Sequence, residues 1–154
     1  MHIDQNLFCA IYNAMGKRKK ESVKNQYNHE FCIIKSDTNK NNYKICGKIW
    51  IEGENGTFLG IGRLILLKKI QKYGSILKAA KAMNMSYKKA WELVDSINKQ
   101  AKKPIVITKK GGRQGGGTVL TEEGKKLIKE FEKLQQKFKN FLNNEITKLS
   151  SLRD

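Results

Sequence analysis

The sequence predicts a mostly helical α+β fold, and three patterns in the later part of its 154 residues carry that prediction. Two short segments with helical apolar spacing are separated by only the three residues 84–86. A β-branched run, 105–107, is followed by a glycine-dense loop and a returning run, 118–120. A long apolar stripe begins after Thr121. This order predicts a winged helix-turn-helix, with a β-hairpin before it and a long helix after it.

The chain carries a large positive charge. Its 31 lysines and arginines against 14 acidic residues give a formal net charge of +17. Residues 1–47 hold 8 basic and 4 acidic groups, and residues 48–154 hold 23 and 10, so the excess is not confined to one tail. A surplus of this size favours a polyanionic partner, although charge also serves solubility alone.

The cysteines and the apolar stretches bear on where the protein works. Cys9, Cys32 and Cys46 are odd in number and lack both the Cys-x-x-Cys spacing and the companion histidines of a zinc site. The apolar stretch 7–12 is too short for a signal peptide, and no run approaches the roughly 20 apolar residues of a membrane span. We expect reduced thiols, no metal, no membrane partner and a cytoplasmic location.

The first 42 residues are polar and show no periodicity, which predicts a weakly ordered extension. From Tyr43 to Ile51 apolar residues then alternate with polar ones, as in a strand. Asn55 and Gly56 suit the positive φ angles of a hairpin turn, after which residues 57–59 return. The predicted parts are an extension over 1–42, a hairpin plus winged helix-turn-helix over 43–121, and a long helix over 122–154.

Cap residues predict where the next helices end. Ser75 and Ser86 are N-cap types, Gly74 is a C-terminal cap, and Asn84 tolerates the left-handed conformation that closes a helix. The three predicted segments, with these caps included, run from about Arg63 to Gly74, from Ser75 to Asn84, and from Ser86 to about Gln100. The residues expected to face inward on the second and third are Ile76, Ala79, Ala80, Met83, Ala90, Leu93, Val94 and Ile97.

The long helix begins after the cap Thr121, with Glu122 and Glu123 placed to favour the helix dipole. Its apolar positions recur at steps of three and four: Leu127, Phe131, Leu134, Phe138, Phe141 or Leu142, Ile146 and Leu149. Such a stripe is longer than one compact domain needs, which indicates a partner helix. We expect a homodimer whose interface contains Leu127, Phe131, Leu134, Phe138 and Leu142.

In a helix-turn-helix the first residues of the second helix enter the major groove of double-stranded DNA. Here they are Ser86, Tyr87, Lys88 and Lys89, with Trp91 one turn after Tyr87 on the same face. The hydroxyls can bond phosphate or base edges, and Trp91 can pack on sugar or thymine methyl groups. The alternatives are a solvated face for the two lysines and a core position for Trp91.

The loop from Lys109 to Gly117 combines cations with glycines that allow close approach to phosphate. As a wing it places Lys109, Lys110 and Arg113 on the DNA backbone or minor groove. It is not a nucleotide phosphate loop, because no Gly-Lys-Ser/Thr follows, but a hairpin tip without function remains an alternative.

The sequence offers little for catalysis. His2 and His29 both lie in the leading segment, and the acidic residues are scattered over lysine-rich stretches. We therefore expect no enzyme, no catalytic residues and no cofactor.

Four motifs in register carry a family resemblance: Gly74 to Lys81, Met85 to Trp91, the tip Gly111 to Gly117, and Leu120 to Gly124. With them, the stretch from Gly47 to about Phe141 resembles the DNA-binding domain of the ModE-type, molybdate-responsive regulators, which is close to the winged domain of LysR-type regulators. The resemblance implies a recognition helix from Ser86, a wing at Lys109 to Thr118, and dimerisation through the helix after Thr121.

Full-length members of that family add domains that bind molybdate or tungstate, and the chain ends at Asp154, so binding of molybdate or another oxyanion is not expected. The leading hypothesis is a homodimeric, sequence-specific DNA-binding transcription regulator. The alternatives are a non-specific, architectural nucleic-acid-binding protein, and a regulator that senses a small anion or another ligand.

Overall fold

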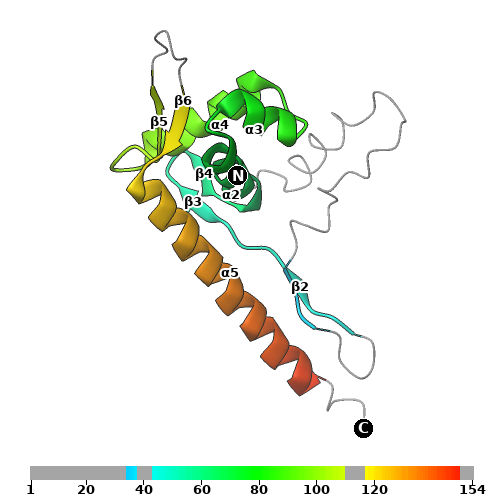
Figure 1. Cartoon of the computed structure of the whole chain (residues 1–154). Coiled ribbons are helices and arrows are strands. Elements are labelled where there is room, and N and C mark those ends of the chain that lie inside the picture. Colours follow the sequence, from blue (N-terminus) through cyan, green and yellow to red (C-terminus); the bar gives the residue numbers. More distant parts are fainter. Residues whose placement is uncertain (1–33, 38–42, 110–116, 150–154) are drawn as a thin grey trace, which may run out of the picture. The chain divides into compact units, whose positions relative to one another are not determined.

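The computed structural model describes residues 34–37, 43–109 and 117–149, all within one compact unit, Cys32–Asp154. In chain order the elements are β1 (Ile34–Lys35), β2 (Cys46–Gly47), β3 (Ile51–Gly53), β4 (Gly56–Leu59), α2 (Ile61–Tyr73), α3 (Ile76–Ala82), α4 (Tyr87–Gln100), β5 (Val106–Lys109), β6 (Gly117–Leu120) and α5 (Glu122–Leu149) (Figure 1). The predicted class is confirmed at this level: mostly helical α+β, with small hairpins and a long last helix.

The strands form three separate antiparallel pairs, β1 with β2, β3 with β4, and β5 with β6. In the third pair Val106 lies opposite Leu120 and Thr108 opposite Thr118. At the β3–β4 turn only Gly56 has a positive φ, 91°, whereas Asn55 does not share this conformation. The turn therefore depends on its glycine alone.

The sequence predicted one strand over the alternating stretch from Tyr43 to Ile51, and this prediction is wrong. The stretch is divided between β2 and β3, and β2 pairs with β1, which lies inside the segment predicted to be weakly ordered. Ser36 fixes this pairing. Its N–H donates to the Ile45 carbonyl at 2.9 Å, and its Oγ accepts from the Ile45 N–H at 2.9 Å.

The predicted helix ends are confirmed by their caps. Gly74 closes α2 with a φ of 62°, and Asn84, after α3, has a φ of 52°. The Oγ of Ser75 accepts from the Lys78 N–H at 3.3 Å, and the Oγ of Ser86 accepts from the Lys89 N–H at 3.1 Å. Because capping satisfies otherwise orphaned N–H groups, each serine contributes about 1 kcal/mol to stability.

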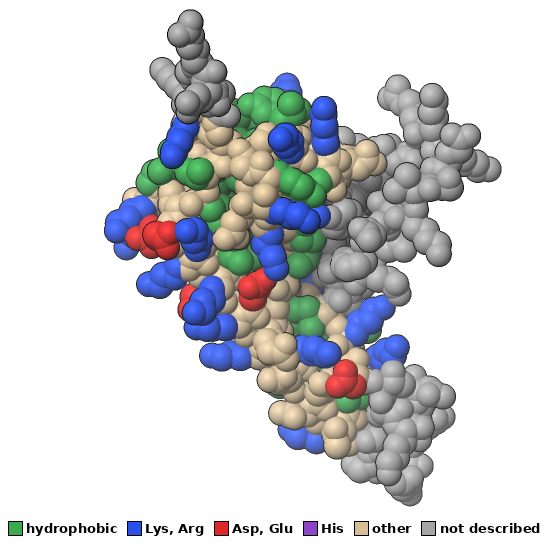
Figure 2. Space-filling model, viewed as in Figure 1, with side chains coloured by type: hydrophobic (Ala, Val, Ile, Leu, Met, Phe, Trp, Pro, Cys, Tyr) green, Lys and Arg blue, Asp and Glu red, His purple; other side chains and the backbone are tan. Residues whose placement is uncertain are grey.

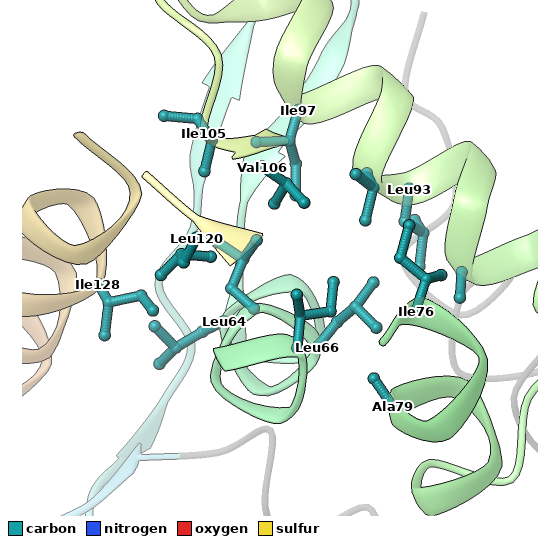
Figure 3. Packing of buried hydrophobic residues seen from close by; sticks show 14 of the residues in the cluster. Leu64, Leu66, Ile76, Ala79, Leu93, Ile97, Ile105, Val106, Leu120 and Ile128 are labelled. Carbon is teal, nitrogen blue, oxygen red and sulfur yellow. The ribbon is translucent and has the colours of Figure 1, made fainter. Parts of the chain in front are cut away.

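The core lies where α2, α3, α4 and the β5–β6 hairpin meet the first half of α5 (Figure 3). All eight residues predicted to face inward on α3 and α4 are buried in it. Leu66, Leu67 and Ile70 enter from α2, Leu120 from β6, and Phe131 from α5. Full burial of each such side chain contributes roughly 1.5–3 kcal/mol, so this cluster holds the α3–α4 pair in place.

The second half of α5 packs on the chain's own β1–β2 pair (Figure 1). A Cβ added to Gly47 would lie 2.7 Å from the ring of Phe138, so this glycine allows β2 to approach the helix closely. The Asp37 N–H donates to Oδ1 of Asn143 at 2.7 Å, and Nδ2 of Asn143 donates back to Asp37 at 2.9 Å. Leu142 and Ile146 are buried on this side of α5.

Candidate nucleic-acid interface

The start of α4 presents a mixed polar and aromatic surface. Tyr87 is 51% exposed and Trp91 48% exposed, and Lys88 is exposed between them in sequence. Ala90, by contrast, is fully buried on a helix that packs against α3. The core alternative for Trp91 is therefore wrong, because the inward face of α4 is occupied by Ala90, Leu93 and Val94.

The turn between α3 and α4 is held by backbone hydrogen bonds, which orient this surface relative to α3. Within it the Asn84 N–H donates to the Lys81 carbonyl at 3.1 Å and the Met85 N–H to the Ala80 carbonyl at 3.0 Å. Ser86, the next residue, is exposed, and its Oγ already accepts the Lys89 N–H. The hydroxyl hydrogen of Ser86 remains able to donate to an acceptor outside the chain.

The lysines near this surface form no ion pair with a carboxylate of the described chain. Among the described residues, no ion pair includes Lys88, Lys89 or Lys109. Lysines that do pair with a carboxylate within 4 Å include Lys68, Lys99, Lys103, Lys125, Lys133, Lys139 and Lys148. On the face drawn in Figure 2, Lys and Arg side chains are widely spread and the few acidic ones lie apart from one another. Unpaired cations suit an external anion.

The β5–β6 hairpin is fastened to both helices next to it. The Thr118 N–H donates to the Gly74 carbonyl at the end of α2, at 2.9 Å. From α4, Oδ1 of Asn98 accepts the N–H groups of Ile105 at 2.9 Å and Val106 at 3.1 Å, and its Nδ2 donates to the Val106 carbonyl at 2.8 Å. The hairpin is thus held relative to the start of α4.

Of the three cations predicted on this hairpin, Lys109 is exposed at the end of β5, whereas Lys110 and Arg113 lie outside the described residues. Sequence reasoning did not single out Asn98. An asparagine two residues before the end of a helix that leads into a β-branched strand was the available signal, but an amide there is equally consistent with a solvated position.

Arg63, at the start of α2, is a partly buried cation. Burial lowers the pKa of its guanidinium, and the nearby Glu52 carboxylate acts in the opposite direction. Its Nη1 donates to the Phe58 carbonyl at 3.3 Å. These contacts fasten α2 to β4, so Arg63 has a structural task apart from the α4 surface.

The five predicted dimer-interface residues fall into three groups. Phe131 and Leu142 are buried within the chain, and Leu127 and Phe138 are partly buried. Leu134 is 43% exposed. Phe141, which was the alternative to Leu142 in the predicted stripe, is 55% exposed. The homodimer stays a prediction, and the exposed positions are the ones left for a partner.

Metal binding and membrane crossing are considered for residues 34–37, 43–109 and 117–149. No group of three His, Cys, Asp or Glu side chains there is placed to hold a metal ion, and no helix there is long and apolar enough to cross a membrane.

This chain is homologous to the N-terminal part of the ModE transcriptional regulators. It is 36% identical over 110 residues to the molybdenum transport protein ModE of Azotobacter vinelandii, covering 68% of this chain and 41% of that protein. With the transcriptional regulator ModE of Haemophilus influenzae it shares 36% identity over 105 residues, 66% of this chain and 41% of the relative. No protein-family model matches the chain.

A third relative is the DNA-binding transcriptional dual regulator ModE of Escherichia coli K12, 40% identical over 74 residues, 48% of this chain and 28% of the relative. The chain therefore spans about two fifths or less of the length of these relatives. None of the three is named for an enzymatic activity, which agrees with the prediction that this chain is not an enzyme.

Proposed function

We propose that this chain is a DNA-binding transcription regulator in which α3 and α4 form a helix-turn-helix and the β5–β6 hairpin is its wing. The observation that carries the proposal is the surface at the start of α4. There the exposed Tyr87 and Trp91 flank lysines that form no ion pair within the described residues, and the opposite face of the helix is buried in the core. Homology to ModE regulators, one of them named as DNA-binding, supports the same assignment.

In this proposal α4 enters the major groove with its first turn. The two lysines supply point charges to the phosphates on either side, and the Ser86 hydroxyl donates to a phosphate or base acceptor. Trp91, one turn further along, packs its indole on sugars or thymine methyl groups. Lys109, with Lys110 and Arg113 on the wing, contacts the backbone next to the helix.

The test compares the wild type with the Lys88→Ala, Lys89→Ala double variant in fluorescence binding to genomic fragments. We expect about tenfold weaker binding and a salt slope smaller by about one to two, since each lost phosphate contact removes roughly 0.9 from the slope. The matched control is Lys125→Ala with Lys126→Ala, an exposed lysine pair on α5. Equal affinity and slope in the double variant and the wild type would refute the assignment.

Sequence preference separates specific regulation from the architectural alternative, which the net charge of +17 also favours. A regulator binds a genomic fragment that contains its operator with much higher affinity than a random duplex of the same length. Equal competition by the random duplex would favour an architectural protein.

The proposed regulator is a homodimer in which α5 of one chain packs on α5 of another. Leu134 and Phe141 are exposed one heptad apart, and the Phe141 ring stacks on that of Phe138 with 6.4 Å between centroids. A twofold dimer of this kind places two recognition helices about one helical turn, ~34 Å, apart on a palindromic operator.

Charges placed on this exposed stripe test the dimer. We expect Leu134→Glu with Phe141→Glu to shift the protein from dimer to monomer in sedimentation, because two buried carboxylates oppose association. Gln136→Glu, an added charge at an exposed position on the same helix, serves as the control and leaves the dimer intact. A wild type that sediments as a monomer contradicts the dimer proposal.

A further inference from the structure

The exposed face of α4 carries a carboxylate that has no lysine partner in the described part of the chain. Glu92 is exposed, and within residues 34–37, 43–109 and 117–149 it takes part in no ion pair. The other acidic residues of the described helices each lie 2.6–3.1 Å from a lysine ammonium, and they are Asp95, Glu122, Glu123, Glu130, Glu132 and Glu145. Glu92 is therefore the exception among them.

Glu92 lies on the side of α4 that meets DNA in the proposed function. Successive residues of an α-helix turn by about 100°, so Glu92 follows Lys88 by one turn, about 40° round the helix and about 6 Å along its axis. The opposite side of α4 is buried, and it holds Ala90, Leu93, Val94 and Ile97. Glu92 therefore shares the exposed face of Lys88.

Lys88 does not neutralise this carboxylate. A lysine followed by a glutamate four residues later is the less favourable order for an ion pair along a helix. In the described part of the chain, neither Lys88 nor Glu92 has an ion-pair partner. Both charged groups are therefore available to a molecule that docks on this face.

A carboxylate on a DNA-binding face favours some bases over others. It accepts hydrogen bonds and donates none, and phosphates repel it whatever the sequence. In the major groove the exocyclic amino groups of cytosine (N4) and adenine (N6) are donors, whereas O6 and N7 of guanine and O4 of thymine are acceptors. A carboxylate in the groove therefore gains a hydrogen bond at cytosine or adenine and is repelled at guanine or thymine.

We propose that Glu92 is a specificity-determining residue whose carboxylate accepts a hydrogen bond from the exocyclic amino group of one base, cytosine N4 or adenine N6, in the major groove. The proposal rests on the proposed function, since it requires α4 to be the recognition helix. The lysines of α4 attract any duplex through its phosphates. Glu92 weakens that general attraction and restores affinity only at a sequence with the right base, so it raises the ratio of specific to non-specific binding.

The test compares the full chain with its Glu92→Ala variant in selection from a library of duplexes with a randomised centre, followed by sequencing. The variant is expected to fold normally, because the position is exposed and alanine is the best helix former. We expect it to lose about tenfold discrimination at one position of the half-site and to keep the preferences at the other positions. Its binding to a fluorescein-labelled random duplex is expected to become about threefold tighter, because a repulsion from the phosphates is removed.

Glu92→Gln distinguishes the two candidate bases. A glutamine amide bonds bidentately to N6 and N7 of adenine. If Glu92 contacts cytosine, this variant therefore changes the preferred base to adenine, and if Glu92 contacts adenine, the preferred base stays adenine. The control is Glu130→Ala, which makes the same change in net charge as Glu92→Ala but lies on α5, where the carboxylate pairs with Lys133 at 2.9 Å. It is expected to leave base preference and random-duplex affinity unchanged.

The same base preference at every position in the wild type and in Glu92→Ala would show that Glu92 is only a solvated residue, and the proposed regulator would still stand. Loss of preference at all positions would also contradict the proposal, because Glu92 would then act on α4 as a whole and not on one base. A wild type that selects no sequence would overturn both sequence-specific regulation and the role of Glu92.

Discussion

Replacing Asn98 with alanine is expected to lower the free energy of unfolding by about 3 kcal/mol. The change removes three hydrogen bonds that one amide makes to Ile105 and Val106. Both residues are buried, at 4% and 3% exposure, so water does not readily replace the lost partner. Two backbone N–H groups and one carbonyl then carry an unpaired cost of about 1 kcal/mol or more each.

Urea unfolding followed by circular dichroism measures this loss, and Asn140→Ala is the control. Asn140 also makes a side-chain hydrogen bond, to Gln136 at 2.9 Å, but it lies exposed on α5, so its removal is expected to change stability by less than about 0.5 kcal/mol. A loss for Asn98→Ala as small as that for the control would mean that the amide is not what joins α4 to β5.

The features that the sequence predicted well are determined by neighbouring residues. A serine that caps its own helix, such as Ser75 or Ser86, acts on an N–H three residues away. Gly74 and Asn84 close their helices through their own φ angles. The inward faces of α3 and α4 followed from the 3.6-residue period, because the core lies on one side of each helix.

The features that the sequence did not reveal depend on distant partners. β1 is two residues long, and it is a strand because Ser36 hydrogen-bonds with Ile45, nine residues later in the sequence. The sequence of the apolar stripe of α5 does not distinguish the residues that are buried within the chain from those that stay exposed. Packing against β1–β2 buries Leu142 and leaves Phe141, its neighbour in sequence, exposed. The spacing of apolar residues predicts the stripe, but only the tertiary structure shows which of its residues are buried within the chain and which are exposed.

Trp91 illustrates the same limit within the candidate interface. Its spacing from Ala90 and Val94 allowed either a core or a surface position, because tryptophan is large and usually well buried. In the structure Trp91 lies at the surface, and the fully buried residue between α4 and α3 is the small Ala90. Close approach of two helices at this joint leaves no room for an indole there.

Gly124→Ala is expected to destabilise the protein by about 2 kcal/mol, although alanine is the better helix former. Gly124 lies in the first turn of α5, where the Thr121 Oγ1 accepts its N–H at 3.0 Å. A Cβ at this position would lie 2.5 Å from the Ile105 carbonyl oxygen and 2.8 Å from the Leu120 side chain. The carbonyl belongs to backbone that cannot rotate away, since it also accepts the Thr121 N–H at 3.0 Å.

Gly62→Ala isolates the helix-propensity term, because a Cβ at Gly62 in α2 would meet no atom of the described residues within 4 Å outside its own chain neighbours and helix backbone. This control is expected to be neutral or to stabilise the protein by up to about 1 kcal/mol, and thermal and urea unfolding of both variants measure the difference. The close approach at Gly124 gives the Leu-Thr-x-x-Gly motif a physical reason: the helix can start against the base of the hairpin only where no side chain intervenes. If both alanines raised stability equally, helix propensity alone would govern this turn, and the contact of Gly124 with Ile105 and Leu120 would be looser than these distances require.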